Sequence, residues 1–263
     1  MAGPTTAERG ARPRPASGHP PQGPADRRFR LPGRRMMIVL IMASVLLAGG
    51  TWALYGSDWL RVERVSTSGT RVLTRGEVEA AAAVPVGAPL ISVDTDGIEA
   101  RLRRKLPRID SVEVARSWPH GIRLKVIERK PVLLIEEGRK FIEVDRSGVR
   151  FAEVEKAPPG VARLELTVDR STAPRRFGTD RLVLEAVRVR SELPGKVAGD
   201  TRRVRVRSYD SISLGLTGGR TVMWGSAEDG AAKARALTAL MKAAPEAGYF
   251  DVSAPTAPAA SGS

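Results

Sequence analysis

The sequence predicts an α+β protein with a single N-terminal transmembrane helix followed by two folded parts. Three observations support this prediction: an uncharged apolar stretch of helical length, a run of elements in the order β-α-α-β-β, and a longer region of short alternating strands that closes with a helix and a strand. The 263 residues leave room for two modest cores, because a domain usually takes about 100 to 200 residues.

The first 55 residues predict a tail and a membrane anchor. Residues 1–35 consist mostly of Pro, Gly, Ala and Arg, with almost nothing to bury, so we expect a disordered basic tail. Residues 36–55 carry no charge, and a helix of about 20 residues spans the roughly 30 Å hydrocarbon layer. Arginines precede this segment and Asp58 follows it, so the positive-inside rule places the N-terminus in the cytoplasm and the later domains outside.

A cleaved signal peptide has the same order of basic, apolar and small-residue zones. Its apolar zone, however, is about 7 to 15 residues long, which is shorter than the uncharged segment here. We therefore expect a retained anchor.

Residues 59–128 carry the β-α-α-β-β order. A strand is expected in WLRVERVSTSG, and Thr74 and Glu77 then form a capping box at the start of a short helix. Asp94 caps a second helix. Apolar residues at every second position on both sides of the WPHG turn predict a β-hairpin with one buried face.

Residues 131–255 read as a β-rich domain. The turn signals EEGR and DRSG separate alternating stretches and predict a β-meander, and TGGR predicts a later hairpin turn. Two helices are expected, one from a capping Asp180 and one from a capping Ser226. We expect residues 256–263 to be a disordered tail.

The closing strand lies in GYFDVSAPTAP. Alternation divides its side chains into a core-facing set and an outward set, which are Phe250, Val252 and Ala254, and Tyr249, Asp251 and Ser253. The last strand of a chain either enters the middle of a sheet or lies along its border. The residues alone leave both arrangements open, including a strand that the chain itself covers.

The residue types present do not favour a catalytic, cofactor or metal site. The absence of cysteine removes disulfides, thiolate metal sites and thiol nucleophiles, and the two histidines lie in the tail and in a turn with Pro119 and Gly121. The sequence DTDG lacks the later ligands of a calcium loop, and no phosphate-binding glycine loop occurs. We expect no catalytic, cofactor or metal site and no small-molecule substrate, although two carboxylates could still meet in space.

Basic residues outnumber acidic ones, and the chain has a net charge of +14. Arg203, Arg205 and Arg207 share one face of a strand, with valines on the other face, and form a possible face for an anionic partner. The plainer interpretation is a solvated sheet surface. Nucleic-acid binding is disfavoured because aromatic residues, which stack on bases, make up only 5% of the chain.

The order of these parts resembles the FtsQ/DivIB family of bacterial cell-division proteins. The resemblance lies in VERVSTSGTRVLTRGEV, DSVEVARSWPHGIRLKVIERKPV, FIEVDRSGVRF, WGSAEDGAAKARAL and YFDVSAP, which together span most of residues 59–255. It implies that residues 59–128 are a POTRA domain and that residues 131–255 are the family's β domain.

The resemblance also implies a function. Members of the family are non-enzymatic divisome scaffolds in the cell membrane at the septum; they link early and late division proteins and bind the FtsB/DivIC–FtsL pair that controls septal peptidoglycan synthesis. The septal transpeptidase and FtsW are further possible partners. A segment of FtsB/DivIC adds to the last strand at the sheet edge, which implies a partner-binding edge over Tyr249, Phe250, Asp251, Val252, Ser253 and Ala254. Some relatives carry basic and aromatic side chains near Ser253 and Ala254, where this chain has small ones.

A different class of function also stays open. An anchored wall hydrolase would use a carboxylate pair, and a wall-polymer binding protein would use the arginine strand. A peptidoglycan digestion assay separates both from a scaffold.

Overall fold

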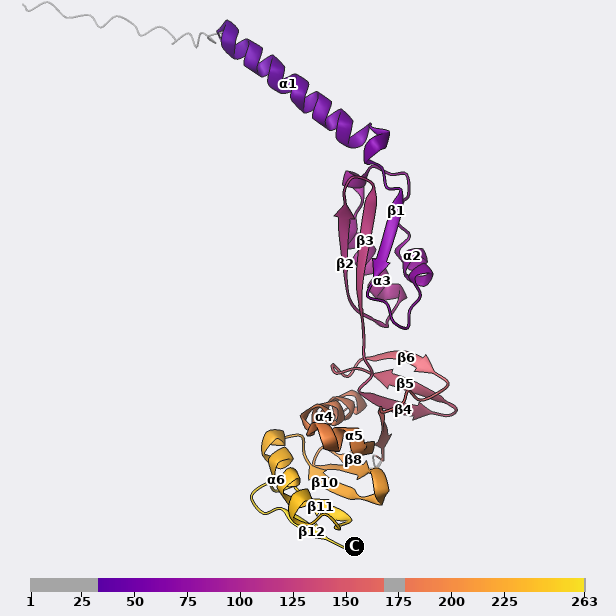
Figure 1. The fold of residues 1–263 in the computed structure, drawn as a ribbon, viewed down its shortest axis with the longest axis vertical. Helices are drawn as coiled ribbons and strands as arrows, with labels where there is room; N and C mark the ends of the chain where they lie inside the picture. The colour runs from indigo at the N-terminus through magenta and orange to yellow at the C-terminus, as the bar shows by residue number, and fades with distance from the viewer. Residues whose placement is uncertain (1–32, 168–177, 263) are drawn as a thin grey trace, which may run out of the picture. The chain divides into compact units, whose positions relative to one another are not determined.

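The computed structural model describes residues 33–167 and 178–262, so the predicted tail of residues 1–35 lies almost wholly outside the described residues. Helix α1 (Arg34–Tyr55) contains the predicted anchor segment (Figure 1). It is the one helix among the described residues that is long and apolar enough to cross a membrane. Its large apolar side chains, such as Leu46 and Leu47, are exposed, as they are on a helix that needs lipid around it.

The first domain confirms the predicted β-α-α-β-β order. Its elements are β1 (Arg64–Ser68), α2 (Arg75–Ala82), α3 (Thr95–Lys105), β2 (Ile109–Ser117) and β3 (Gly121–Glu128). Two short 3-10 turns, η1 (Asp58–Leu60) and η2 (Leu90–Ser92), lie before β1 and between the helices. Strand β3 is central, parallel to β1 and antiparallel to β2.

The predicted helix caps fix where α2 and α3 begin. The Thr74 side chain accepts from the Glu77 backbone N–H at 3.2 Å, and the Glu77 carboxylate accepts from the Thr74 N–H at 2.7 Å. Asp94 accepts from the Gly97 N–H at 2.9 Å. One face of each helix then packs on the sheet, where Leu102 and Leu124 are fully buried.

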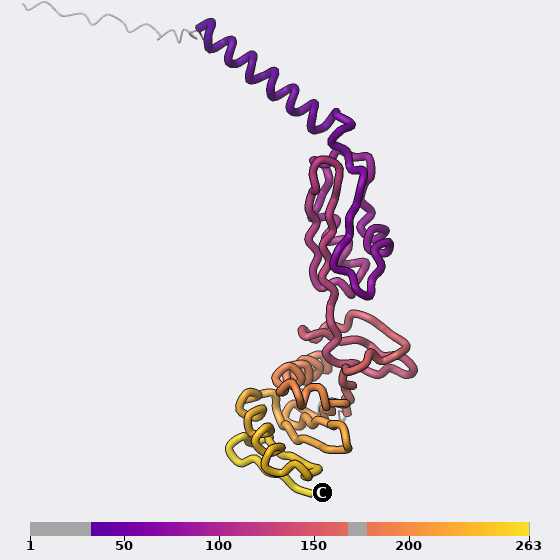
Figure 2. Tube along the Cα trace, viewed as in Figure 1, coloured from indigo at the N-terminus to yellow at the C-terminus, as the bar shows by residue number. Residues whose placement is uncertain are grey.

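The second domain is one nine-stranded sheet with helices on one face (Figure 1). Its strands are β4 (Leu133–Glu137), β5 (Lys140–Val144), β6 (Arg150–Val154), β7 (Ala162–Leu166), β8 (Thr201–Ser208), β9 (Ser211–Leu216), β10 (Thr221–Gly225), β11 (Tyr249–Asp251) and β12 (Ala259–Ser261). The helices are α4 (Thr179–Glu192), α5 (Gly195–Asp200) and α6 (Gly230–Ala243), and η3 (Thr217–Gly219) forms the predicted TGGR turn. The strand order is β12-β11-β10-β9-β8-β7-β4-β5-β6, and the path of the chain can be followed in Figure 2.

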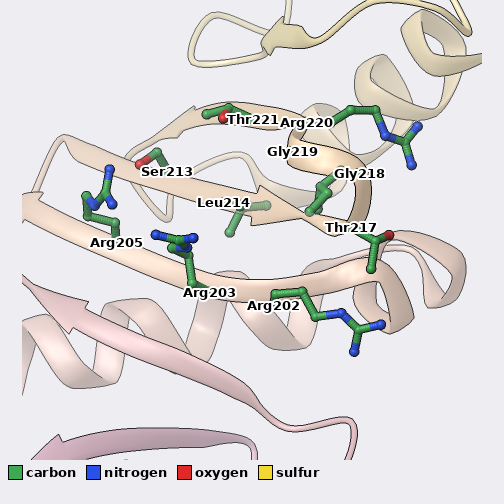
Figure 3. Close-up of a pocket in the computed structure, with 12 residues that line it drawn as sticks. Arg202, Arg203, Arg205, Ser213, Leu214, Thr217, Gly218, Gly219, Arg220 and Thr221 are labelled. Atoms are coloured by element: carbon green, nitrogen blue, oxygen red, sulfur yellow. The ribbon is translucent and has the colours of Figure 1, made fainter.

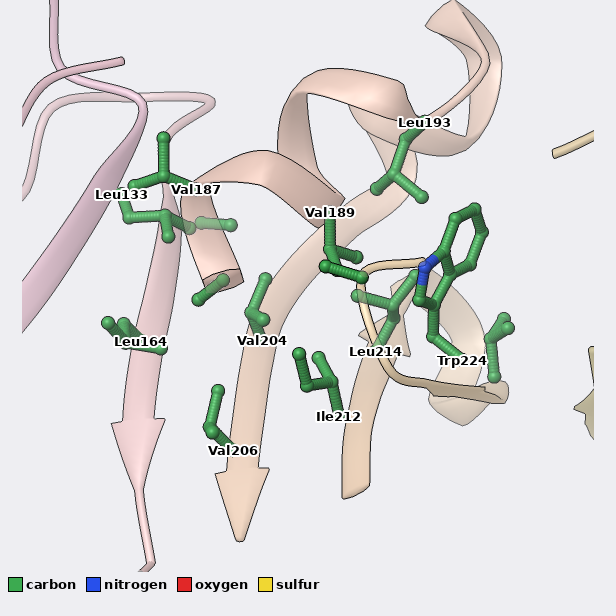
Figure 4. Close-up of a cluster of buried hydrophobic side chains, with 14 of the residues drawn as sticks. Leu133, Leu164, Val187, Val189, Leu193, Val204, Val206, Ile212, Leu214 and Trp224 are labelled. Atoms are coloured by element: carbon green, nitrogen blue, oxygen red, sulfur yellow. The ribbon is translucent and has the colours of Figure 1, made fainter. Parts of the chain in front are cut away.

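The core of the second domain lies between the sheet and its helices (Figure 4). Val204 and Val206 of β8 and Leu214 of β9 point from the sheet toward Val187 and Val189 of α4, and all five are buried. Arginines occupy the alternate positions of β8 and point to the opposite face, where Arg203 and Arg207 are exposed.

Two helices begin elsewhere than predicted. The N-cap of α4 is Gly178, and Asp180 lies within the first turn. The N-cap of α6 is Asp229, not Ser226. Ser226 instead accepts, through its backbone carbonyl, from the buried Lys233 ammonium at 2.9 Å, so it binds a side chain of α6 and does not cap the helix.

The end of the chain differs most from the prediction. Residues 256–263 are not simply a disordered tail, because residues 259–261 form β12 and pair antiparallel with β11. Strand β11 therefore lies between β10 and β12, and the prediction that residues 249–254 form the sheet border is wrong. The chain turns back after β11, and the border strand is β12.

The Glu77 cap predicts a pH-dependent start of α2. The Thr74 backbone N–H, and then its hydroxyl, lower the pKa of Glu77 below the ordinary value of 4.5, so the capping stabilisation is complete above that value and is lost as the pH falls through the lowered pKa. The protection factors of the amides in the first turn of α2, which correct measured rates for the intrinsic slowing of exchange in acid, should therefore fall on acidification. In Glu77→Gln, whose amide oxygen still accepts but does not titrate, this fall should be absent; an equal change in protection factor in both proteins would contradict the assignment.

Candidate partner-binding sheet edge

The parallel pairing of β10 and β11 determines which backbone groups of β11 form hydrogen bonds to β10 and which point toward β12. The Thr221 N–H donates to the Gly248 carbonyl at 2.8 Å, and the Val252 N–H donates to the Met223 carbonyl at 2.9 Å. In a parallel ladder this pattern turns the N–H and C=O of Phe250 toward β10. The polar groups of its neighbours, Tyr249 and Asp251, consequently face β12.

The same alternation locates the free groups on β12. Ser261 lies opposite Tyr249 and Ala259 lies opposite Asp251, so both bind back to β11. The N–H and C=O of Ala260, between them, point away from the sheet. Ala260 thus presents one backbone donor and one backbone acceptor at the border.

The six residues predicted as the edge fall into three groups by burial. Phe250 and Val252 are fully buried, as their predicted core-facing positions require, and Tyr249 and Asp251 lie half-buried on the other face. Ser253 and Ala254 follow the strand and are exposed, so the prediction that Ala254 faces the core is wrong. The Asp251 carboxylate accepts from the Ser253 N–H at 2.9 Å and from its hydroxyl at 2.7 Å, which begins the turn toward β12.

Strand β12 differs in charge from the other border strands of the two described sheets. Each of the other three, β1, β2 and β6, carries at least one charged side chain, for example Arg64, Glu113 and Glu153. In β2 the Val114 N–H also donates to the Glu99 carboxylate at 3.0 Å, so a helix side chain occupies a backbone donor there. Charged and covered borders discourage pairing with another strand, whereas β12 contains only two alanines and a serine.

An apolar groove adjoins β12. It has a volume of about 530 Å³ and is lined by residues of α6 and by the two prolines that flank the turn between β11 and β12. Its lining residues are Ala232, Arg235, Ala236, Ala239, Leu240, Ala243, Pro255 and Pro258. A strand paired with β12 could therefore place apolar side chains against α6.

The three arginines predicted as an anionic face lie on β8. Arg205 donates to the Glu165 carboxylate at 2.9 Å, Arg203 lies 3.4 Å from the same carboxylate, and Arg207 is exposed. Arg203 and Arg205 line a cleft that Arg207 does not line (Figure 3). Sequence reasoning missed the other two arginines of this cleft, Arg202 and Arg220, because a register shift in β8 and the TGGR turn bring them there.

The described residues hold no group of three or more His, Cys, Asp or Glu side chains that could bind a metal ion. Glu136 and Glu137 are adjacent carboxylates on β4, where successive side chains point to opposite faces, so these two do not form a carboxylate pair. The β12 border offers other chemistry: backbone hydrogen bonding at Ala260 and apolar contact in the groove.

Removing β12 should show how β11 is paired. In a chain that ends at Pro258, the Tyr249 and Asp251 amides should exchange with solvent faster, because they lose their acceptors on β12. The Phe250 amide should stay protected, because it bonds to β10. Exchange measured by NMR at single residues tests this; loss of protection at Phe250 together with its neighbours would contradict the assigned register.

Comparison with known proteins agrees with this architecture. The model of the POTRA domain, FtsQ-type, matches residues 60–129. The cell division protein FtsQ of Streptomyces venezuelae is 63% identical over 269 residues, which cover all of this chain and 99% of that protein. The FtsQ of Streptomyces coelicolor is 65% identical over 268 residues, covering the whole of both chains.

More distant proteins also match. The FtsQ of Mycolicibacterium smegmatis is 31% identical over 226 residues, covering 86% of this chain and 65% of that protein. The solved extracytoplasmic domain of DivIB from Geobacillus stearothermophilus overlaps with a TM-score of 0.33 and 17% identity, over 44% of this chain and 93% of that chain. The full-length identity to the Streptomyces proteins shows that this chain belongs to the FtsQ/DivIB family of bacterial cell-division proteins.

Proposed function

We propose that this chain is a non-catalytic scaffold of the division complex, and that the β12 border accepts a strand from a partner of the FtsB/DivIC type. The observation that carries this proposal is the uncharged border with free backbone groups at Ala260, next to an apolar groove. Strand addition uses backbone hydrogen bonds for affinity and side-chain pockets for specificity. The proposed contact is thus moved from residues 249–254 to β12.

The short border sets what the partner must contribute. Ala260 offers a donor and an acceptor, whereas Pro258, the previous residue on the same side, has a carbonyl but no N–H. One backbone hydrogen bond contributes a net stabilisation of only about 0.5–1.5 kcal/mol. The small number of such bonds at this border is therefore too weak to hold a partner alone. Apolar side chains of the partner would supply the rest by filling the groove against Leu240 and the alanines of α6.

The anchor gives the scaffold its place in the cell. Helix α1 would cross the membrane once, with the arginine-rich N-terminus in the cytoplasm and both domains outside. In this arrangement the first domain would contact other division proteins near the septal membrane. The second domain would hold the FtsB/DivIC–FtsL pair that controls septal peptidoglycan synthesis.

The outward amide of Ala260 is the first test. Ala260→Pro removes this donor without removing a bond between β11 and β12, so binding of the FtsB/DivIC partner from the same organism should weaken roughly 10- to 100-fold, because a partner carbonyl is left unpaired. The matched control is Ala260→Ser, which keeps the N–H and should bind within a few-fold of the natural chain. Affinity is measured with both full chains in detergent micelles.

Equal binding by the proline and serine variants would contradict strand addition at β12. Circular dichroism and the exchange protection of Phe250 show in the same samples that the second domain is folded.

A charge in the groove is the second test. Ala239 is exposed and lines the groove, so Ala239→Glu should leave the core intact and weaken partner binding roughly tenfold, or about 1.4 kcal/mol. Ala231→Glu adds the same charge at an exposed position of α6 outside the groove and should have little effect. If both variants weaken binding equally, net charge and not the groove controls recognition.

A further inference from the structure

An arginine-lined cleft of about 410 Å³ lies on the face of the second domain's sheet opposite the helices (Figure 3). It sits where β8, β9 and β10 approach the η3 turn. Its charged lining consists of arginine alone, at Arg202, Arg203, Arg205 and Arg220. Four guanidinium groups around one cleft repel one another unless negative charge lies among them.

The acidic side chains nearby do not balance these arginines. Glu165 pairs with both Arg203 and Arg205, at 3.4 Å and 2.9 Å. Asp200 lies 3.7 Å from Arg220. Arg202 is exposed and forms no ion pair with any residue in the described ranges. Two carboxylates therefore face four guanidinium groups, which leaves a surplus of positive charge in the cleft.

The local backbone makes room for this arrangement. Gly215 lies opposite Arg203 in the β8–β9 ladder, and a Cβ at Gly215 would lie 2.9 Å from the Arg203 Cγ. The missing side chain thus lets Arg203 lie across β9 toward the cleft. Hydroxyl-bearing residues Ser213, Thr217 and Thr221 complete the polar lining.

We propose that this cleft binds a phosphate-type oxyanion. The planar guanidinium fork pairs with two phosphate oxygens at once, and arginine is preferred over lysine wherever such bidentate recognition is needed. A phosphate group brings enough oxygen acceptors to contact several guanidinium and hydroxyl groups together. Free phosphate and the phosphodiester of an anionic polymer share this chemistry. A peptide carboxylate offers two oxygens and one charge, which matches the surplus less well.

The arginine cleft is separate from the proposed partner border. Strands β8 and β12 are four positions apart in the sheet, which is roughly 19 Å at the usual strand spacing. A ligand in the cleft therefore leaves the backbone of Ala260 free.

The test uses the full chain in detergent micelles and two probes, inorganic phosphate and a short poly(glycerol phosphate). Arg202→Gln should weaken binding of both probes about tenfold, the effect of losing a charge-assisted hydrogen bond. Arg207→Gln is the matched control, because Arg207 is also exposed on the same strand but does not line the cleft. It should bind like the natural chain.

A second variant tests the cleft at constant charge. Gly215→Val displaces Arg203 and should weaken binding about tenfold without changing net charge. Phosphate binding without polymer binding supports a small-anion site, and tighter polymer binding supports the polymer as the source. Equal loss in Arg202→Gln and Arg207→Gln, unchanged binding in Gly215→Val, or tighter binding of hexaglutamate than of the polymer would each overturn the proposal.

Discussion

An open β-sheet ends in two strands whose outer backbone groups have no partner in the sheet, and this constraint shapes the second domain. One end, β6, carries Arg150 and Glu153, whose charges oppose pairing with another chain. The other end, β12, carries only small uncharged side chains. The two ends of the sheet therefore differ: charges on β6 oppose pairing with another strand, whereas nothing charged on β12 opposes it.

The layer structure determines what surrounds the available border. Helices cover one face of the sheet, so α6 extends beside β11 and contributes the apolar groove next to β12. On the other face, the arginines that alternate with the buried valines of β8 are exposed or half-buried. The same period-two alternation thus builds the core on one face and gathers positive charge on the other. Backbone recognition at the border and anion recognition on the open face are therefore physically separate possibilities.

Much of this architecture can be predicted from the sequence, because local signals decide it. An uncharged apolar run of about 20 residues predicts a membrane-spanning helix, and this prediction does not depend on the fold of the later domains. The Thr74–Glu77 capping box and the Asp94 cap fix two helix starts through contacts three residues apart. The alternation of Val204 and Val206 with arginines fixes which face of β8 is buried.

The border could not be predicted, because nothing local marks it. The sequence AAS follows two prolines, has weak strand propensity and becomes a strand only by pairing with β11. Phe250 and Val252 were correctly predicted to face the core, but burial does not reveal how many neighbours a strand has. The arginine cleft could not be predicted from the sequence for the same reason. Arg220 joins Arg203 only through a turn and a register shift, which depend on the folded sheet.

The central claim is that Ala260 carries the free backbone groups to which a partner strand bonds. The most direct measurement is the hydrogen-exchange rate of the Ala260 amide, alone and with the FtsB/DivIC partner bound. We expect the Ala260 amide to exchange fast in the free chain and to be strongly protected in the complex, with the already paired Ser261 amide changing much less. An Ala260 amide that is protected before the partner is added, or that still exchanges fast in a saturated complex, would contradict it.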